Sequence, residues 1–241
     1  MRWSKKLWSG IAAGAAAVGG LAYAATATVE RMPAPTHVET WLTDLEAAAI
    51  EIPAGSPARE AIEAGELDAA REMLGFRPRA EAPLPEGFPA FTPVGVIEVK
   101  TYPAYRKAVG GSFWPLFNHI SKQGIPMTAP VEMSSETGRR GDGEMAFLYQ
   151  NTSVGDVGPI DGVAVEDTAE TVVASLGMRG GFRDGAAQDA KTRLEAWLAG
   201  QTQYRRAAKG DAAFRLFGYN SPMVPNSEKY WEAQLLLEPA E

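Results

Sequence analysis

Few residues of this chain could ligate a metal or act as a nucleophile. The 241 residues include two histidines and no cysteine. Without cysteine there is no disulfide, no thiolate metal ligand and no cysteine nucleophile. His37 and His119 are too few for a multi-histidine metal site within one chain. A neutral imidazole nevertheless ligates metals well, so His119, within a predicted helix, is our candidate metal ligand.

The sequence patterns of common catalytic sites are missing. The chain has no glycine-rich phosphate loop, no H-E-x-x-H and no G-x-S-x-G. The adjacent acids Glu166 and Asp167 would point to opposite faces of a strand, because successive side chains alternate. We interpret both as solvated surface residues and expect no enzymatic activity.

The element that would position His119 is an amphipathic helix that ends at Gly124. Its apolar residues recur at i, i+3, i+4 and i+7, one stripe on a helix: Phe113, Leu116, Phe117 and Ile120. Ser112 is placed to cap the N-terminus of this helix. At about 100° per residue, His119 falls on the flank of the stripe. There it could face the edge of a cleft, or it could be a half-exposed surface histidine.

Three segments around this helix resemble one protein family. They are "IEVKTYPAYRKA", "IPMTAPV" directly after the helix, and "FGYNSPMVPNSEKYWEAQLLLE" near the C-terminus. In that order they resemble the SOUL/heme-binding protein family, over residues 94–239. Members are small antiparallel α+β barrels that bind heme or other tetrapyrroles, and most have no established catalytic activity. The resemblance implies a non-catalytic domain that holds heme non-covalently, since covalent c-type attachment needs cysteine.

A tetrapyrrole requires a broad apolar slot and a few cations for its propionates. The resemblance implies that five candidate slot residues lie on a helix face and on the neighbouring strand or loop: Phe113, Phe117, Met127, Tyr219 and Met223. Lys107, Lys122 and Lys229 are possible propionate partners. The alternative is that these aromatic and methionine side chains belong to the core.

The sequence departs from the family at positions that matter for iron. The histidine proposed as axial ligand in some members aligns with Thr101, which ligates heme iron poorly. His119 aligns with a position that is usually tyrosine, so a ligand role is not carried over. Near the C-terminus, Trp231 replaces the usual asparagine while Glu232 keeps the glutamate position. We therefore expect binding by hydrophobic contact, with His119 as the candidate iron ligand.

The chain after residue 92 repeats one pattern. "GVIEVKTYPAYRKAVG" (95–110) and "GVAVEDTAETVVASLG" (162–177) have equal length, and a helix follows each, the second over residues 186–199. Two more strands follow each helix, at about 125–133 and 145–150 and then at about 213–219 and 230–238. Two ββαββ units predict an α+β fold with eight antiparallel strands and two flanking helices. The family resemblance implies that these strands form a distorted barrel.

The N-terminal residues have the layout of an export signal. Arg2, Lys5 and Lys6 precede a charge-free run from Leu7 to Val29, and residues 22–24 offer an A-x-A cleavage site. The run is also long enough to cross a bilayer as an anchor. Residues 1–29 are therefore predicted to be a signal peptide or a membrane anchor. Either would place the domain outside the cytoplasm, in the periplasm or an equivalent exported location.

Residues 30–92 form a separate predicted segment before the domain at 93–241. A capping box at Thr36 and Glu39 opens a helix to about residue 50, and a second helical stretch begins at Ser56-Pro57 and is interrupted by Gly65. The sequence "RPRAEAPLPEGFPAFTP" predicts a Pro-rich linker. We interpret the segment as a helical spacer, with a lid over the binding slot as the alternative.

The charge of the chain limits its partners. A formal net charge of −7 argues against a nucleic-acid partner, which needs a basic face. Heme or another tetrapyrrole is the expected partner, with the membrane added if the N-terminal segment is not cleaved. Two alternatives stay open: a GyrI-like binder of another small molecule, because that fold also repeats ββαββ, and a hydrolase on the same scaffold.

Overall fold

The computed structural model describes residues 29–134, 143–182, 185–207 and 213–240. The predicted export segment, residues 1–29, lies almost entirely outside them. Among the described residues, no helix is long and apolar enough to cross a membrane.

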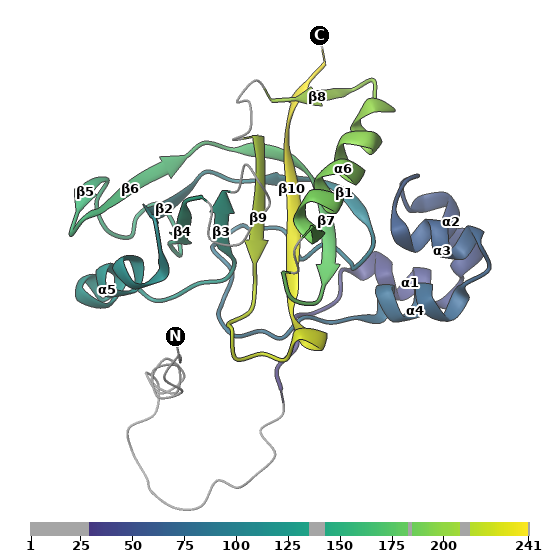
Figure 1. Ribbon diagram of the computed structural model, residues 1–241, viewed down its shortest axis with the longest axis horizontal. Helices are drawn as coiled ribbons and strands as arrows, with labels where there is room; N and C mark the ends of the chain where they lie inside the picture. The colour runs from purple at the N-terminus through teal and green to yellow at the C-terminus, as the bar shows by residue number, and fades with distance from the viewer. Residues whose placement is uncertain (1–28, 135–142, 183–184, 208–212, 241) are drawn as a thin grey trace, which may run out of the picture.

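The described residues form one large antiparallel sheet with helices beside it (Figure 1). The helices are α1 (Thr36–Thr43), α2 (Leu45–Glu51), α3 (Pro57–Glu63), α4 (Leu67–Gly75), α5 (Phe113–Gln123) and α6 (Ala186–Ala199), with a short 3₁₀ turn at Asn226–Glu228. The strands are β1 (Ile97–Tyr102), β2 (Tyr105–Gly110), β3 (Val131–Ser134), β4 (Met145–Leu148), β5 (Gly158–Ile160), β6 (Val163–Thr168), β7 (Thr171–Arg179), β8 (Tyr204–Arg206), β9 (Phe214–Gly218) and β10 (Tyr230–Pro239).

The strand order contains the predicted internal repeat. The strands are ordered β1-β7-β10-β9-β3-β4-β2-β6-β5, and β8 pairs with β10. Each strand of the first unit has a counterpart in the second: β1 corresponds to β6, β2 to β7, β3 to β9 and β4 to β10. When each strand is replaced by its counterpart, the order of these eight strands is the same order read from the other end. The sheet thus consists of two ββαββ units related by an approximate two-fold axis between β3 and β9. Strands β5 and β8 are additions that the repeat did not predict.

The predicted distorted barrel is wrong. Among the described residues β1 pairs with β7 alone and β5 pairs with β6 alone, so the sheet has two edges and is not closed. These edges lie on opposite sides of the molecule in Figure 1. Strand β5 has three residues, and one of them, Pro159, has no N–H to donate. Such a short strand has few backbone N–H and C=O groups with which the edge of another sheet could form hydrogen bonds.

Helices α5 and α6 pack against the same face of the sheet, one on each repeat. Helix α5 covers β2, β4 and β6, and α6 covers β7 and β10. Both helices were predicted with these bounds, because the apolar period of 3.6 residues is a local signal. Gly124 ends α5 in the left-handed conformation, with φ 65°, which glycine adopts without steric cost.

The four N-terminal helices form a small core of their own that also contacts the sheet. This core contains Val38, Trp41, Ile52, Ala58, Leu74 and Val96. The predicted helix through residue 50 is divided into α1 and α2 at Asp44, whose side chain accepts a hydrogen bond from the Ala47 N–H at 2.9 Å. The predicted capping box is also wrong, because Pro35 takes the N-cap position and Thr36 is already helical.

Residues 76–94, which we call the strap, lie on the face of the sheet that bears no helix. The strap has no helix or extended strand, as the Pro-rich sequence predicted. Its side chains Phe76, Phe91 and Val94 share a core cluster with sheet residues such as Tyr102 and Phe217. The Pro-rich part of the predicted spacer therefore packs against the sheet of the domain.

Candidate functional site

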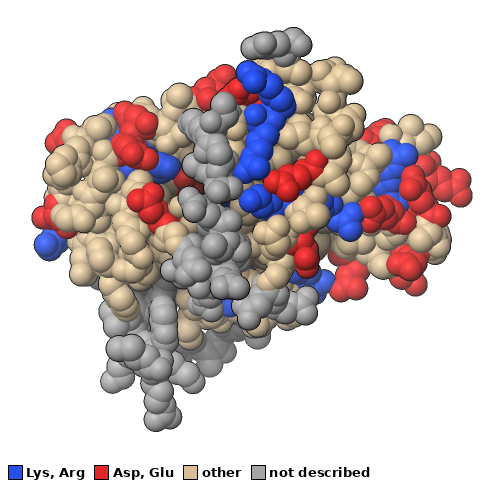
Figure 2. All heavy atoms as spheres, turned by 45° about the horizontal axis from the view of Figure 1, so that its top comes forward, with Lys and Arg blue, Asp and Glu red and all other residues tan. Residues whose placement is uncertain are grey.

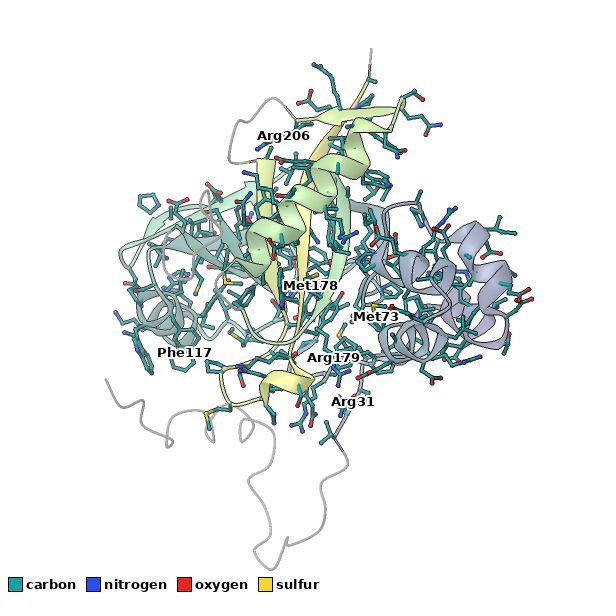
Figure 3. All side chains as sticks on the ribbon, turned by 45° about the vertical axis from the view of Figure 1, so that its right-hand side comes forward. Arg31, Met73, Phe117, Met178, Arg179 and Arg206 are labelled. Atoms are coloured by element: carbon teal, nitrogen blue, oxygen red, sulfur yellow. The ribbon has the colours of Figure 1, made fainter. Side chains whose placement is uncertain are left out.

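A cluster of aromatic rings lies at the surface of α5. We call Phe113, Trp114 and Phe117 the α5 ring cluster, and Figure 3 shows Phe117 on this helix, away from the N-terminal helices. The ring centroids of Phe113 and Phe117 are 5.6 Å apart and their planes are nearly parallel, and Trp114 stands edge-on to both. Phe113 and Phe117 are half-buried, and Trp114 is 43% exposed.

The cluster continues into the core of the first repeat. Phe113 packs edge-on against Phe147 of β4, at 5.3 Å between centroids. Met127 is half-buried and contacts the same core. Leu116 and Ile120 are buried below the rings. The sequence-predicted residues Phe113, Phe117 and Met127 are thus brought together, and Trp114 joins them although the apolar stripe did not include it.

His119 lies inside the protein rather than at the edge of a cleft. Its side chain is 1% exposed. The Nε2 atom is 2.6 Å from the hydroxyl of Tyr149, and Nδ1 has no hydrogen-bond partner among the described residues. Burial lowers the pKa of His119, so the imidazole is neutral at pH 7, the form that ligates metals. Among the described residues no group of three or more His, Cys, Asp or Glu side chains could hold a metal ion.

The three predicted propionate partners lie apart. Lys122 on α5 is exposed and its nearest acid is Asp161, at 4.0 Å. Lys107 is on β2, where it binds Glu132 at 2.7 Å and lies 3.5 Å from Glu166. Lys229 precedes β10 and donates to the side chain of Asn226. Lys122 is the one of these three that lies on the same helix as the α5 ring cluster.

Tyr219 and Met223 differ in exposure, since Tyr219 is buried and Met223 is exposed. Tyr219 is 4% exposed and its hydroxyl donates to Glu232 at 3.2 Å, under the strap. Met223 is 55% exposed in the loop between β9 and β10. Because Val131 of β3 pairs with Gly218 of β9, the chain before β3 and the chain after β9 leave the sheet at the same end. Met223 and Met127 therefore lie on neighbouring loops.

A buried polar cluster on the strap face was not predicted from the sequence. Its centre is Glu232, which is fully buried. Its two carboxylate oxygens accept hydrogen bonds from one backbone N–H and six side chains: Thr92, Lys100, Tyr102, Ser175, Tyr219, Tyr230 and Gln234. Burial alone would raise the pKa of Glu232, but Lys100 and the Thr92 N–H outweigh it and lower the pKa to about 2.

This cluster fixes the strap. The N–H of Thr92 donates to Glu232 at 2.8 Å, and the single hydroxyl proton of Tyr230 is shared between the carbonyl of Thr92, at 2.6 Å, and Glu232, at 2.9 Å. Lys100 donates to the carbonyl of Ala90 at 2.7 Å. Polar residues alternate as Tyr230, Glu232 and Gln234 in an otherwise apolar strand, and this was the available sequence signal for a polar buried face.

A groove of about 840 Å³ lies between α6 and the start of α3. Trp197, Leu176 and Met178 give it apolar walls, and Figure 3 shows Met178 below α6. Arg193 at its edge is bound to Glu60 at 2.7 Å and to the carbonyl of Gly55 at 3.0 Å. None of the sequence-predicted site residues lines this groove.

The charged groups do not form a single basic face. In the view of Figure 2 acidic side chains gather over the N-terminal helices at the right, with basic ones among them, and a short run of basic side chains lies near the top centre. The acids Glu166 and Asp167, predicted as solvated surface residues, are both exposed, and each lies beside a cation of β2. Asp167 accepts two hydrogen bonds from Arg106, at 2.7 and 2.9 Å.

Comparison with known proteins identifies a family. The family model described as SOUL heme-binding protein matches residues 90–233, more than half of the chain. No curated protein sequence matches the chain.

The solved structures that this chain resembles are distant in sequence. The C-terminal domain of EcmrR is 14% identical, with a TM-score of 0.45, covering 59% of this chain and 96% of that one. A hydrolase from Listeria innocua is 12% identical, with a TM-score of 0.45, covering 61% and 94%. SAV2435 bound to tetraphenylphosphonium is 12% identical, with a TM-score of 0.32, covering 59% and 93%.

Proposed function

Because the chain belongs to the SOUL heme-binding protein family, we propose that it binds heme or a related tetrapyrrole non-covalently on the α5 ring cluster. The observation that carries the site is the exposure of this cluster. Trp114 is 43% exposed beside two half-buried phenylalanines. Water-exposed aromatic rings in contact with one another are a favourable surface for a flat apolar ligand.

The residues around the cluster fit the parts of a tetrapyrrole unequally. Phe113, Trp114, Phe117 and the thioether of Met127 supply apolar contact for the macrocycle. Lys122, 66% exposed on the same helix, supplies a cation for a propionate. Heme, once bound, would bring its iron chemistry to this surface. The fit of the protein to iron itself is poor, because His119 is buried and hydrogen-bonded to Tyr149.

Hydrophobic contact is therefore the main source of affinity in this proposal. His119 could ligate iron after Tyr149 releases it and α5 shifts, which would cost a buried hydrogen bond. Binding without catalysis is part of the proposal, and so is an exported location set by the N-terminal segment. A GyrI-like binder of another molecule and a hydrolase remain the competing functions.

A hemin titration of the full-length chain, followed by absorbance, tests the proposal. We expect a shifted Soret band that saturates at one hemin per chain. Trp114→Ala and Phe117→Ala should each weaken hemin binding by about tenfold, or about 1.4 kcal/mol, through the loss of ring contact. The matched control is Ile50→Ala, because Ile50 is an exposed apolar residue on α2, 82% exposed.

Two results would contradict the proposal. A chain that shows no Soret shift does not bind hemin, and the competing functions would then stand. Equal hemin affinity in the wild type, Trp114→Ala and Phe117→Ala would place the ligand elsewhere on the domain.

A further inference from the structure

The face of the sheet opposite α5 contains a second aromatic site, and the strap fills it. Tyr102, Tyr105 and Phe217 form what we call the three-ring slot. The ring of Phe88 stands edge-on to Tyr102 and Tyr105, at 5.0 and 5.3 Å between centroids, and lies nearly parallel to Phe217 at 6.4 Å. A flat ring from the strap thus occupies a slot whose walls come from β1, β2 and β9.

The same three rings also hold a buried guanidinium. The Cζ atom of Arg215 lies 4.4 Å from the Phe217 centroid, 5.3 Å from that of Tyr102 and 5.9 Å from that of Tyr105. Arg215 is 5% exposed. Its Nε donates to Gln234 and its Nη1 to the Tyr105 hydroxyl, but Nη2 has no hydrogen-bond partner among the described residues.

An unpaired N–H on a buried guanidinium is costly, and such a group marks a place where an acceptor could bind. The nearest carboxylate, Glu132, contacts Nη1 at a long 3.5 Å. It already binds Lys107 at 2.7 Å and accepts from the Tyr105 hydroxyl at 2.7 Å. The planar fork of Arg215 therefore lacks the bidentate anion for which its geometry is suited.

The part of the strap that carries Phe88 is held less firmly than its ends. At one end the carbonyl of Pro83 accepts from the Ala129 N–H at 3.0 Å, and at the other Lys100 binds the carbonyl of Ala90. Between them, residues 84–89 make one backbone hydrogen bond to the rest of the described chain, from Glu86 N–H to the Gln150 carbonyl. Opening of residues 84–89 would break that bond and leave both ends attached.

We propose that the three-ring slot is a binding site for a planar aromatic carboxylic acid, and that Phe88 is the residue that this ligand displaces. The ligand ring takes the position of the Phe88 ring, and its carboxylate pairs with Arg215. The charge of the ligand follows from the neighbours. Both buried carboxylates of this face are already saturated, Glu232 by seven donors and Glu132 by Lys107, Tyr105 and Arg215. A cationic ligand would find no free acceptor among them.

Calorimetric titration of the full-length chain with benzoate tests this site. Because Phe88 competes with the ligand for the slot, Phe88→Ala should bind benzoate at least about tenfold more tightly than the wild type. Phe88→Leu, which keeps apolar contact with the strap, should give a smaller increase. The matched control is Phe113→Ala, a half-buried phenylalanine on the opposite face, and it should not change benzoate affinity.

Ligand charge separates this site from a simple apolar cavity. In Phe88→Ala, benzyl alcohol and benzylammonium have the same ring as benzoate and should bind at least about tenfold more weakly. Arg215→Lys, which keeps the charge but loses the planar fork, should reduce benzoate affinity in the Phe88→Ala background. Equal binding of the three probes in folded Phe88→Ala, or no benzoate binding in either Phe88 variant, would refute the proposal.

This site is independent of the proposed heme site. Phe88→Ala should leave hemin affinity unchanged, and Phe113→Ala should weaken hemin binding without changing benzoate binding. A hemin affinity that rises in Phe88→Ala would mean that the two ligands share the strap face, and the separate site would then be wrong.

Discussion

Replacement of Glu232 by glutamine should destabilise the fold strongly, because it removes the charge around which the strap face is organised. The carboxylate is fully buried and is 3.1 Å from Lys100, whose side chain is 6% exposed. The glutamine side chain would leave this ammonium without its counter-ion and would place an amide NH₂ among groups that donate hydrogen bonds. Breaking a buried ion pair in this way costs about 3–5 kcal/mol.

The pKa of Glu232 gives an independent magnitude. Its pKa falls from 4.5 to about 2 on folding, and each pKa unit corresponds to about 1.4 kcal/mol, so the ionised group stabilises the fold by about 3 kcal/mol. The folded pKa is lower than the unfolded one. The stabilisation is therefore present above pH 4.5 and is lost as the pH falls toward 2, with about 2 kcal/mol already lost at pH 3.

Urea unfolding of wild type and Glu232→Gln, at pH 7 and at pH 3, measures both effects. The difference in free energy of unfolding should be about 3–5 kcal/mol at pH 7 and about 2 kcal/mol smaller at pH 3. Titration of other carboxylates cancels in this difference. Glu166→Gln is the control, because Glu166 is 55% exposed and should cost less than about 1 kcal/mol at either pH. A difference that is below about 1 kcal/mol, or that does not shrink at pH 3, would refute this reasoning.

The remaining predictions concern α5, the iron ligand and export. Leu116→Ala should destabilise the fold by about 2–5 kcal/mol in urea unfolding, because Leu116 is fully buried. Phe117→Ala should cost less than this, since Phe117 is half-buried, and Ser121→Ala should cost little. A greater cost for Phe117→Ala than for Leu116→Ala would contradict that burial. His119→Ala should keep hemin bound with at most about tenfold weaker affinity, whereas loss of the Soret shift in a folded variant would make His119 an axial ligand. Folding lowers the pKa of His119, so its contribution to the free energy of unfolding is present above about pH 6.5 and is lost as the pH falls below that value. The free energy of unfolding of His119→Ala should therefore change less between pH 7 and pH 5 than that of the wild type. N-terminal sequencing of native protein should find residue 25 first if the export segment is cleaved, and a full-length protein free in the cytosol would exclude export.

Local sequence signals predicted much of the first and second repeats. The bounds of α6 and the end of α5 at Gly124 follow from apolar periodicity and glycine stops, which need no tertiary contact. The strand expected over residues 125–133 is shorter, because Pro126 and Pro130 cannot donate to a ladder and it begins only at Val131.

Long-range contacts account for what the sequence could not predict. Glu232 accepts hydrogen bonds from Thr92, Tyr102 and Ser175, which are 140, 130 and 57 residues away along the sequence. No local pattern brings these residues together, so the role of Glu232 and the position of the strap were not predicted. The open sheet is a similar case, since closure depends on whether the two edge strands meet. His119 was placed at the flank of α5, but the chain after β4 brings Tyr149 against it and buries it.

Nuclear magnetic resonance spectroscopy of the isotope-labelled full-length chain with hemin tests the central claim most directly. The paramagnetic iron broadens the signals of nearby amides, and the zinc-substituted porphyrin is the diamagnetic control. If heme binds on the α5 ring cluster, the amide signals of residues 113–127 should broaden most, and those of strap residues 84–92 should be unaffected. Broadening centred on the strap or on the groove beside α6, with residues 113–127 unchanged, would contradict it.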